Sequence, residues 1–552
     1  MFSAHRSAVV AFVLSSLTIA GCGRAGGGTA ALSAASAGRL AETAFQIRVP
    51  SKKSSSAGRA PAYVSPATQS IEITATPSAG APVSVHQDLT PASGNCRASN
   101  PVGYLDCTIV LSLAPGSYTA DFATYDATGG ASGGGNLLAQ TKGYPFTVAP
   151  GVANTVSATL GGIPASVLIT PAPNQIHVTG AQTGGYAIIG ARPQRFLIFA
   201  LDADQNAIIG PGLPSLTVTT SDGGTNLNVA PVPGNPNAYS VRVVRYSATP
   251  LTLSVSAQPV AGSGIVTPTT ATVPLSTVQE FWIAESHPDV VSAWAVRNGV
   301  ATEIPGDEIT NGLHQPMGIA FDSTGRLWVA NFTGGDATAY RPGNDTPIAT
   351  ISGLLNPRAF AFDASGALWI ANQNAPGDSA GMVTAYDISG ASPVPLPSKT
   401  IVGAAAQLDQ PAGIAFDASG TLWVSNIRGS KVTAYAAGTT TPISADTIAL
   451  PANSYPNELA FDTSGTLWVT RSNSGTIQGY VPGTTTPTSV RSVTSNSPRG
   501  LAFDTDGNLW TTTSTDVEAF APGAAGPTTA ATFSLGFSMF GQRYGAGIVW
   551  TP

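Results

Sequence analysis

The sequence predicts an all-β protein in which two antiparallel β-sandwiches are followed by a six-bladed β-propeller that the C-terminal strand closes. The propeller is indicated by a tryptophan-containing phrase that recurs every 41 to 54 residues, which is the length of a propeller blade. The sandwiches are indicated by short runs in which apolar and polar residues alternate between clusters of Gly, Pro, Asn and Ser. Charged residues make up only 10% of the chain, which suits short strands and turns better than long helices.

Residues 1–21 are predicted to be a signal peptide. His5 and Arg6 precede an apolar stretch over 8–19, which is too short to span a membrane as a helix but has the length of a signal-peptide core. The stretch runs into Ala20, Gly21 and Cys22, and this ending resembles the lipobox of bacterial lipoproteins. The resemblance implies that Cys22 is lipidated and becomes the mature N-terminus. We therefore expect an exported, lipid-anchored protein of the outer membrane or cell surface; an ordinary signal peptide with a chance cysteine is the alternative.

The two remaining cysteines are Cys96 and Cys107. An exported protein reaches a compartment that permits disulfides, so an even pair favours a disulfide between them. A zinc site is the rival interpretation, but two cysteines without a nearby histidine or further cysteine make a poor one.

The chain between the N-terminal segment and the propeller divides into a tether and two modules. Residues 22–41 are rich in Gly, Ala and Ser and are expected to be flexible. Residues 42–162 and 163–276 each carry the alternating pattern of one sandwich. The turn and strand at 114–118 resemble segments of bacterial immunoglobulin-like surface modules, which implies two Ig-like spacers or adhesive modules. The glycine-rich stretch 129–135 is expected to be a mobile loop.

Residues 277–552 carry the propeller repeats. Each complete repeat has a first strand that ends in Phe-Asp, a turn with Gly, and a second strand that contains Trp. Six Trp strands accompany only five first strands, and the missing copy occurs at 545–549. A ring in which this strand completes the blade begun by 281–305 leaves no sheet edge unpaired.

The repeated residues themselves are expected to build the blades. We expect the Asp to cap its turn rather than to bind metal, and the Trp to act as a wedge between blades. They are Asp322, Asp363, Asp417, Asp462 and Asp504, with Trp282, Trp328, Trp369, Trp423, Trp468 and Trp510. The phrase Gly413-Ile-Ala-Phe-Asp417, followed by Leu422-Trp-Val-Ser-Asn426, resembles NHL-type and streptogramin-lyase-like (virginiamycin B lyase-like) propeller repeats. The resemblance covers half the chain and specifies the fold better than the function, because the repeated residues are those that pack blades.

Functional residues are therefore sought where the repeats differ. Polar residues that leave the Trp strands or enter the first strands are expected around the channel mouth, where they suit a polar ligand. Solvated loop residues would look the same in the sequence. The predicted ligand-binding rim is Asn331, Arg358, Asn372, Asn426, Asn457, Arg471 and Arg499. The weaker catalytic candidates are Glu285, His287 and His314.

Two functions are compatible with this pattern. The favoured one is a monomeric binding or scaffold module for a glycan, a peptide or an envelope protein. The alternative is a metal-dependent lactone-opening enzyme. Resemblance to streptogramin lyases implies a His base and Mg²⁺, and resemblance to gluconolactonases implies a divalent ion such as Ca²⁺ held by Glu, Asn and Asp; no residue is assigned to the metal.

Other classes lack support in the sequence. Nucleic acid is not an expected partner, because the net charge is −6 and the body of the chain has no Lys/Arg run. The sequence also has no Gly-x-Ser-x-Gly, His-Glu-x-x-His or phosphate-loop motif, so triad hydrolases, zincins and nucleotide enzymes are not indicated.

Overall fold

The computed structural model describes residues 39–50, 64–99, 103–210, 212–297, 300–375, 380–481, 483–492, 497–527, 532–535, 537–538, 541–542 and 545–551. Within these ranges the chain forms β-strands, four short 3-10 helices and no α-helix, so the all-β prediction is confirmed. None of these helices has the length and apolar character needed to cross a membrane. The predicted signal peptide, the lipidation site Cys22 and the tether up to residue 38 lie outside the described residues.

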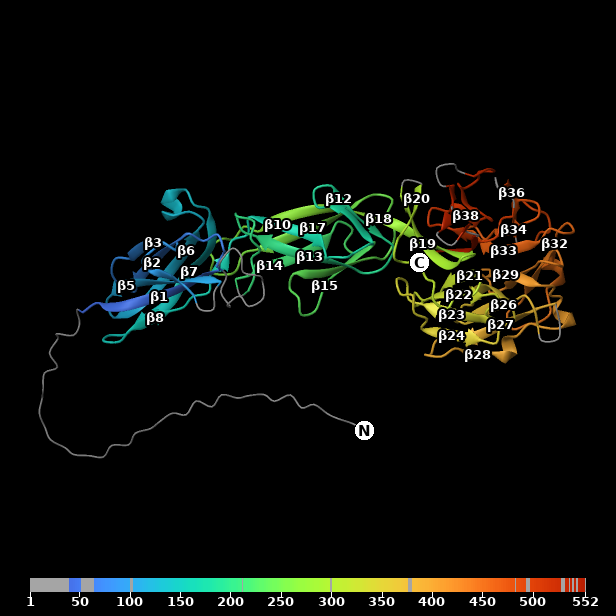
Figure 1. The fold of residues 1–552 in the computed structure, drawn as a ribbon, viewed down its shortest axis with the longest axis horizontal. Coiled ribbons are helices and arrows are strands. Elements are labelled where there is room, and N and C mark those ends of the chain that lie inside the picture. The colour runs from blue at the N-terminus through green and yellow to red at the C-terminus, as the bar shows by residue number, and fades with distance from the viewer. Residues whose placement is uncertain are drawn as a thin grey trace, which may run out of the picture.

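Two facing sheets form the N-terminal part, drawn in blue and cyan in Figure 1. Their strand orders are β4-β5-β1-β8 and β3-β2-β6-β7-β9. Apolar side chains of both sheets share one core, in which the rings of Phe45 and Phe122 lie 5.7 Å apart. The strands are β1 (Ala41–Pro50), β2 (Ser70–Pro77), β3 (Val83–Asp88), β4 (Cys96–Ala98), β5 (Tyr104–Leu113), β6 (Gly116–Tyr125), β7 (Leu137–Val148), β8 (Asn154–Val156) and β9 (Gly161–Gly162).

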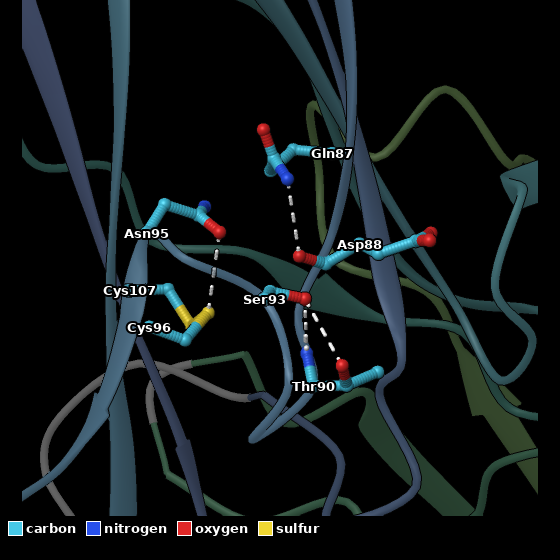
Figure 2. The surroundings of a disulfide bond; sticks show 7 residues. All are labelled: Gln87, Asp88, Thr90, Ser93, Asn95, Cys96 and Cys107. Atoms are coloured by element: carbon cyan, nitrogen blue, oxygen red, sulfur yellow. Dashed lines mark hydrogen bonds between the residues drawn. A yellow bond between two sulfur atoms is a disulfide. The ribbon is translucent and has the colours of Figure 1, made fainter.

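Cys96 and Cys107 are joined by a disulfide between β4 and β5, as the sequence predicts (Figure 2). They are directly opposite each other in the antiparallel ladder of these two strands. The bond therefore fastens the short edge strand β4 to the central strand β5, within a loop whose ends are 11 residues apart.

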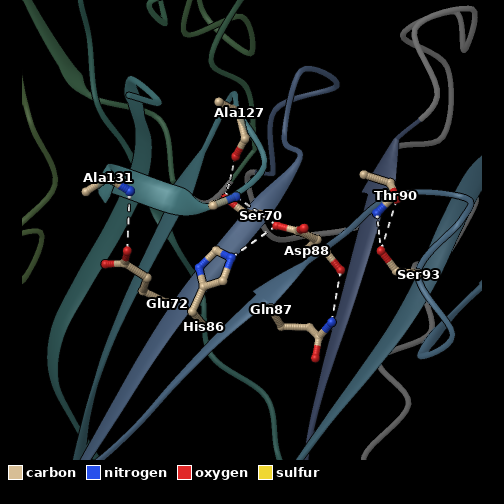
Figure 3. A network of polar contacts seen from close by, with 10 residues as sticks. Ser70, Glu72, His86, Gln87, Asp88, Thr90, Ser93, Ala127 and Ala131 are labelled. Atoms are coloured by element: carbon tan, nitrogen blue, oxygen red, sulfur yellow. Dashed lines mark hydrogen bonds and ion pairs between the residues drawn. The ribbon is translucent and has the colours of Figure 1, made fainter. Parts of the chain in front are cut away.

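The glycine-rich stretch after β6, which we expect to be mobile, contains a short helix and makes polar contacts with other strands. Its centre is the 3-10 helix η1 (Gly130–Gly133). Side chains of β2 and β3 accept hydrogen bonds from its backbone, since Asp88 accepts from Gly129 at 2.9 Å and Glu72 accepts from Ala131 at 3.3 Å. Figure 3 shows these carboxylates beside His86, whose Nε2 lies 3.1 Å from Asp88 Oδ1. Glycine composition alone did not reveal these anchors because they come from other strands.

A second pair of sheets follows, with strand orders β10-β13-β16-β15 and β11-β12-β18-β17-β14. Its inner side chains continue the core of the first pair, so both pairs belong to one apolar cluster. The strands are β10 (Ser166–Pro171), β11 (Val178–Ala181), β12 (Gly185–Ile189), β13 (Gln194–Leu201), β14 (Ser215–Thr220), β15 (Leu227–Pro231), β16 (Ala238–Val243), β17 (Leu251–Gln258) and β18 (Thr269–Ser286).

β18 is one continuous strand that belongs to both halves of the molecule. Leu275, in its first part, pairs with β17 and β12, whereas Gln279 and the residues after it pair with β19 (Asp289–Arg297). The second part also pairs with the C-terminal strand β43 (Gly545–Trp550), and β19 pairs with β20 (Val300–Glu303). The predicted boundary between 276 and 277 thus falls inside a strand. In Figure 1 β18 runs from the green sheets toward the rest of the chain, from about residue 277 onward, which we call the propeller-like half.

The rest of the chain forms five four-stranded sheets, each built from consecutive antiparallel strands. The first three comprise β21 (Pro316–Phe321), β22 (Leu327–Asn331), β23 (Asp336–Tyr340) and β24 (Ala349–Ser352); β25 (Pro357–Phe362), β26 (Leu368–Asn372), β27 (Met382–Asp387) and β28 (Val394–Pro395); and β29 (Pro411–Phe416), β30 (Leu422–Asn426), β31 (Lys431–Tyr435) and β32 (Ile448–Ala449). The last two comprise β33 (Pro456–Phe461), β34 (Leu467–Arg471), β35 (Thr476–Tyr480) and β36 (Ser489–Ser492); and β37 (Leu501–Phe503), β38 (Leu509–Thr512), β39 (Asp516–Phe520) and β40 (Phe533–Ser534). The remaining elements are the β41 (Phe537–Ser538) and β42 (Gly541–Gln542) pair and the 3-10 helices η2 (Pro397–Lys399), η3 (Ala404–Ala406) and η4 (Ser444–Asp446).

The repeated Asp and Trp hold each hairpin together and join it to the next sheet. In the third sheet, Asp417 Oδ1 accepts the backbone N–H of Ser419 and Thr421, and its Oδ2 accepts the indole N–H of Trp423 at 3.0 Å. The Trp423 ring packs edge-on against Phe461 of the following sheet, 6.3 Å away. All five repeated Asp residues bind their own Trp in this way. The Asp therefore serves the turn, and the Trp lies between sheets.

Candidate functional site

The first strands of the five sheets and β43 contact one another in a closed sequence. β21 contacts β25, β25 contacts β29, β29 contacts β33, and β33 contacts β37, while β43 contacts both β37 and β21. The approach is close: a Cβ on Gly413 would lie 2.4 Å from the carbonyl oxygen of Asn457, and a Cβ on Gly547 would lie 2.4 Å from that of Met317. Glycine at these two positions lets the neighbouring strands meet.

A small cavity of about 30 Å³ lies near the start of these strands. The strands β21, β25, β29 and β33 each shift register just after their first residue, which marks a β-bulge. A bulge re-aims the side chain it carries, and the residue after the first proline of each strand lines the cavity. The lining residues are Met317, Arg358, Ala412, Asn457, Glu458, Arg499 and Ala546.

Arg358 reaches across the cavity to a strand two sheets away. Its Nη2 donates to Asn457 Oδ1 at 3.1 Å, and its Nη1 donates to Gln373 Oε1 at 3.3 Å. The guanidinium also lies 5.8 Å from the centre of the Phe332 ring. Burial and the positive charge of Arg499 lower the pKa of Arg358 to about 10. Two arginines therefore share one small, poorly solvated space.

Glu458 and Arg499 complete the charged part of the lining. Burial raises the pKa of Glu458 to about 8, although the backbone N–H of Leu459 and the charge of Arg358 favour the carboxylate form. Burial likewise lowers the pKa of Arg499. Within the described ranges no hydrogen bond or ion pair of the Arg499 guanidinium is found, and its backbone carbonyl accepts from Thr470 at 3.2 Å.

The structure brings together three residues of the predicted rim, Arg358, Asn457 and Arg499, and adds Glu458, which the sequence reasoning missed. The signal was present, because a charged residue replaces a small one at this repeat position. The other five copies carry Gly318, Ala359, Gly413, Gly500 and Gly547. A charge at a position that otherwise needs a small side chain costs desolvation free energy, which points to a role beyond packing.

Three of the four predicted rim asparagines are built into their sheets. Asn331, Asn372 and Asn426 end the second strands and are at most 1% exposed. Each side-chain oxygen accepts a backbone N–H from the loop that leads into the first strand, at 3.2, 3.3 and 2.9 Å. Each amide donates to a threonine of the third strand, at 3.1, 3.0 and 3.1 Å. The structure thus gives these side chains a role in the fold, and ligand contact by them stays a prediction.

The other predicted residues lie away from the cavity lining. Arg471 takes the place of the asparagine in its sheet and donates to Ser454 at 2.9 Å. Glu285 is fully buried and accepts a hydrogen bond from Ser292 at 2.5 Å. His287 and His314 are exposed. None of these four lines the cavity, and their binding or catalytic roles stay predictions.

One buried group in the described residues has the donor types of a metal site: His177, Glu280 and Asp307. It lies between the second sandwich and the propeller-like half, and none of its members lines the cavity. Arg192 Nη2 donates to Glu280 at 2.5 Å and also to Asp307. The guanidinium already supplies the positive charge that these carboxylates need. Mg²⁺ and Ca²⁺, which prefer shells of oxygen ligands, therefore do not fit this group.

Comparisons with known proteins give only distant likenesses. No family model and no curated protein matches the chain. Among solved structures it is similar to virginiamycin B lyase from Staphylococcus aureus, at 15% identity and a TM-score of 0.31 over 54% of this chain and 96% of that one. It is also similar to a Xanthomonas campestris gluconolactonase, at 16% identity and a TM-score of 0.30 over 48% of this chain and 80% of that one. A Bacteroides caccae protein of unknown function is similar at 9% identity and a TM-score of 0.36, over 50% of this chain and 99% of that one.

Proposed function

We propose that the second half of the chain is a six-bladed β-propeller that β43 closes, and that it acts as a binding or scaffold module. Five four-stranded sheets of one strand order, and a sixth set formed by β43, β18, β19 and β20, support the six blades. The contacts between first strands, which pass through all six and return to β21, support closure by the C-terminal strand.

The observation that carries a binding function is the uneven lining of the cavity. At equivalent positions the six strands contribute three apolar residues and three polar ones, the latter being Arg358, Asn457 and Arg499. Packing alone would favour small apolar residues throughout, because burying a guanidinium costs free energy unless it is well paired. The polar part of the lining is therefore assigned to a ligand.

The remaining parts of the chain suit a protein that presents this site away from a surface. In Figure 1 the two sandwiches and the propeller-like half follow one another in a row, so the cavity lies in the part farthest from β1. We propose a monomer held in the cell envelope by lipid on Cys22, with the two Ig-like sandwiches as spacers. Its ligand is a glycan, a peptide or an envelope protein.

Binding is tested with the full-length protein on glycan and peptide arrays. Arg358→Gln is expected to abolish the signal, because it removes a lining guanidinium. Arg428→Gln is the matched control, since Arg428 is exposed on the loop between β30 and β31 and is outside the lining. Equal binding by the two variants would show that the site lies elsewhere.

Anchoring is tested separately by cell fractionation. Cys22→Ser is expected to move the protein from the membrane fraction to the soluble fraction, because it removes the thiol that would carry lipid. A variant that stays with the membrane would rule out this anchor without bearing on the cavity.

A further inference from the structure

We propose that the cavity binds its ligand through a carboxylate group, held between Arg358 and Arg499. The inference rests on the proposed binding function and adds the chemistry of the bound group. It would apply to any ligand that presents a carboxylate, such as a uronic acid sugar or the C-terminus of a peptide.

The first support is the charge of the lining. Arg358 comes from β25, and Arg499 comes from the residues that lead into β37; both line the cavity. Burial lowers the pKa of Arg358, and the positive charge of Arg499 lowers it further. Glu458 does not form an ion pair with either arginine within 4 Å in the described structure. An anion between the two guanidiniums would relieve their repulsion in a space where screening by water is weak.

The second support is the supply of hydrogen-bond donors. A guanidinium carries five N–H donors, and the side-chain bonds of Arg358 to Asn457 and Gln373 use two of them. Arg499 has no side-chain hydrogen bond within the described ranges. Planar guanidiniums bind planar carboxylates through paired N–H···O hydrogen bonds. Each of the two arginines can therefore donate hydrogen bonds to the oxygens of one bound carboxylate.

The third support is size. A cavity of about 30 Å³ has room for roughly one or two water molecules. Space for so few waters suits a small acidic group better than a whole sugar ring. The ligand would therefore insert only its acidic group and leave its body at the channel mouth.

Glu458 lines the cavity beside the two arginines. With a pKa of about 8, its carboxyl group is mostly protonated at neutral pH. A protonated carboxyl group donates an O–H hydrogen bond. In that form Glu458 adds a donor for the bound carboxylate and does not cancel the charge of the arginines.

The test is isothermal titration calorimetry of the full-length protein with sodium glucuronate, N-acetylalanine, glucose and inorganic phosphate. Glucuronate and N-acetylalanine are expected to bind and glucose is not, because glucose lacks the carboxylate. Arg358→Gln and Arg499→Gln are each expected to weaken binding about 10- to 100-fold, the effect of losing a charge-assisted hydrogen bond. Arg428→Gln is expected to bind like the native protein. Tryptophan fluorescence checks that each variant is folded, and Arg358→Lys replaces Arg358→Gln if the latter unfolds.

The outcomes separate this proposal from the binding function. Phosphate binding without carboxylate binding overturns the carboxylate assignment, and so do carboxylates that bind equally to the native protein and to Arg499→Gln. If array ligands without a carboxylate bind, and their binding requires Arg358, the carboxylate assignment is also overturned. The proposed binding function is then still supported. If neither the arrays nor the acids give a signal, both proposals fail.

Discussion

Arg192 is the residue whose loss should most disturb the junction between the second sandwich and the propeller-like half. It lies between β12 and β13 and donates to Glu280 on β18 and to Asp307 beyond β20. Both carboxylates are at most 3% exposed. Burial alone would raise the pKa of Asp307, but contacts with His177 and Arg192 outweigh it and hold this pKa below its ordinary value.

We expect Arg192→Met to lower the free energy of unfolding by about 3 to 5 kcal/mol at pH 7, because it leaves two buried carboxylates without their cation. The carboxylates would then bind protons, and their pKa values would rise above those of the unfolded chain. An acid with a raised folded pKa costs stability as the pH increases above its unfolded pKa. Between pH 7 and pH 5 the loss should shrink by about 2.7 kcal/mol for each carboxylate that stays protonated, at 1.36 kcal/mol for each pH unit.

Urea denaturation followed by tryptophan fluorescence measures this effect selectively. All eight tryptophans lie at or beyond Trp282, so the signal reports the propeller-like half. The matched control is Arg195→Met on β13, an exposed arginine whose loss should change stability by no more than about 0.5 kcal/mol. Adding Glu280→Gln and Asp307→Asn to Arg192→Met should recover part of the loss. The reasoning is refuted if Arg192→Met matches the control at pH 7 or loses the same stability at pH 5 and pH 7.

Three further predictions concern other parts of the chain. Replacing Cys96 and Cys107 together by serine should lower the free energy of unfolding by about 3 kcal/mol, because the unfolded chain then no longer has an 11-residue loop closed. A calorimetric melting temperature that reductant does not change would contradict this prediction. Asp417→Ala should lower the free energy of unfolding by about 1 to 3 kcal/mol, because it leaves an indole N–H and two backbone N–H groups without their acceptor. The control Asp506→Ala, at an exposed position, should leave the free energy of unfolding unchanged in the same urea assay. The melting temperature of Glu458→Gln should rise relative to that of the native protein between pH 5 and pH 8. The native carboxyl group has a raised folded pKa of about 8, so the native protein loses stability over this pH range and the glutamine variant does not. Parallel curves of melting temperature against pH would show that Glu458 is not protonated in the fold.

The repeats were readable from the sequence because their key contacts are local. Asp417 and Trp423 lie six residues apart in one hairpin, so the same contact leaves the same spacing in every copy. Six Trp strands against five first strands predicted that the C-terminal strand pairs with the first Trp strand. The structure confirms this, since β43 pairs with β18. The disulfide followed from the export context and the number of cysteines.

The cavity was only partly readable because it depends on bulges and on side-chain direction. Arg358 and Asn457 were singled out as residues that enter first strands, but the bulge that turns them toward the cavity leaves no mark in an alternating pattern. Asn426 ends a strand near the same face, yet its side chain turns inward to bind Thr433. The group around Arg192 joins residues more than a hundred positions apart, and no spacing rule connects them.

The pairing of β43 with β18 also dictates when this half of the molecule can mature during synthesis. Thr551 bonds to Glu280, which the ribosome makes 271 residues earlier. Until β43 emerges, the strand segment that contains Phe281 and Ile283, both fully buried in the finished fold, presents an open and apolar edge. Such long-range pairing forms late and slowly. A chain cut short before 545 would keep that edge available to other strands, so nearly full-length fragments should be more prone to aggregation than fragments that stop before β18.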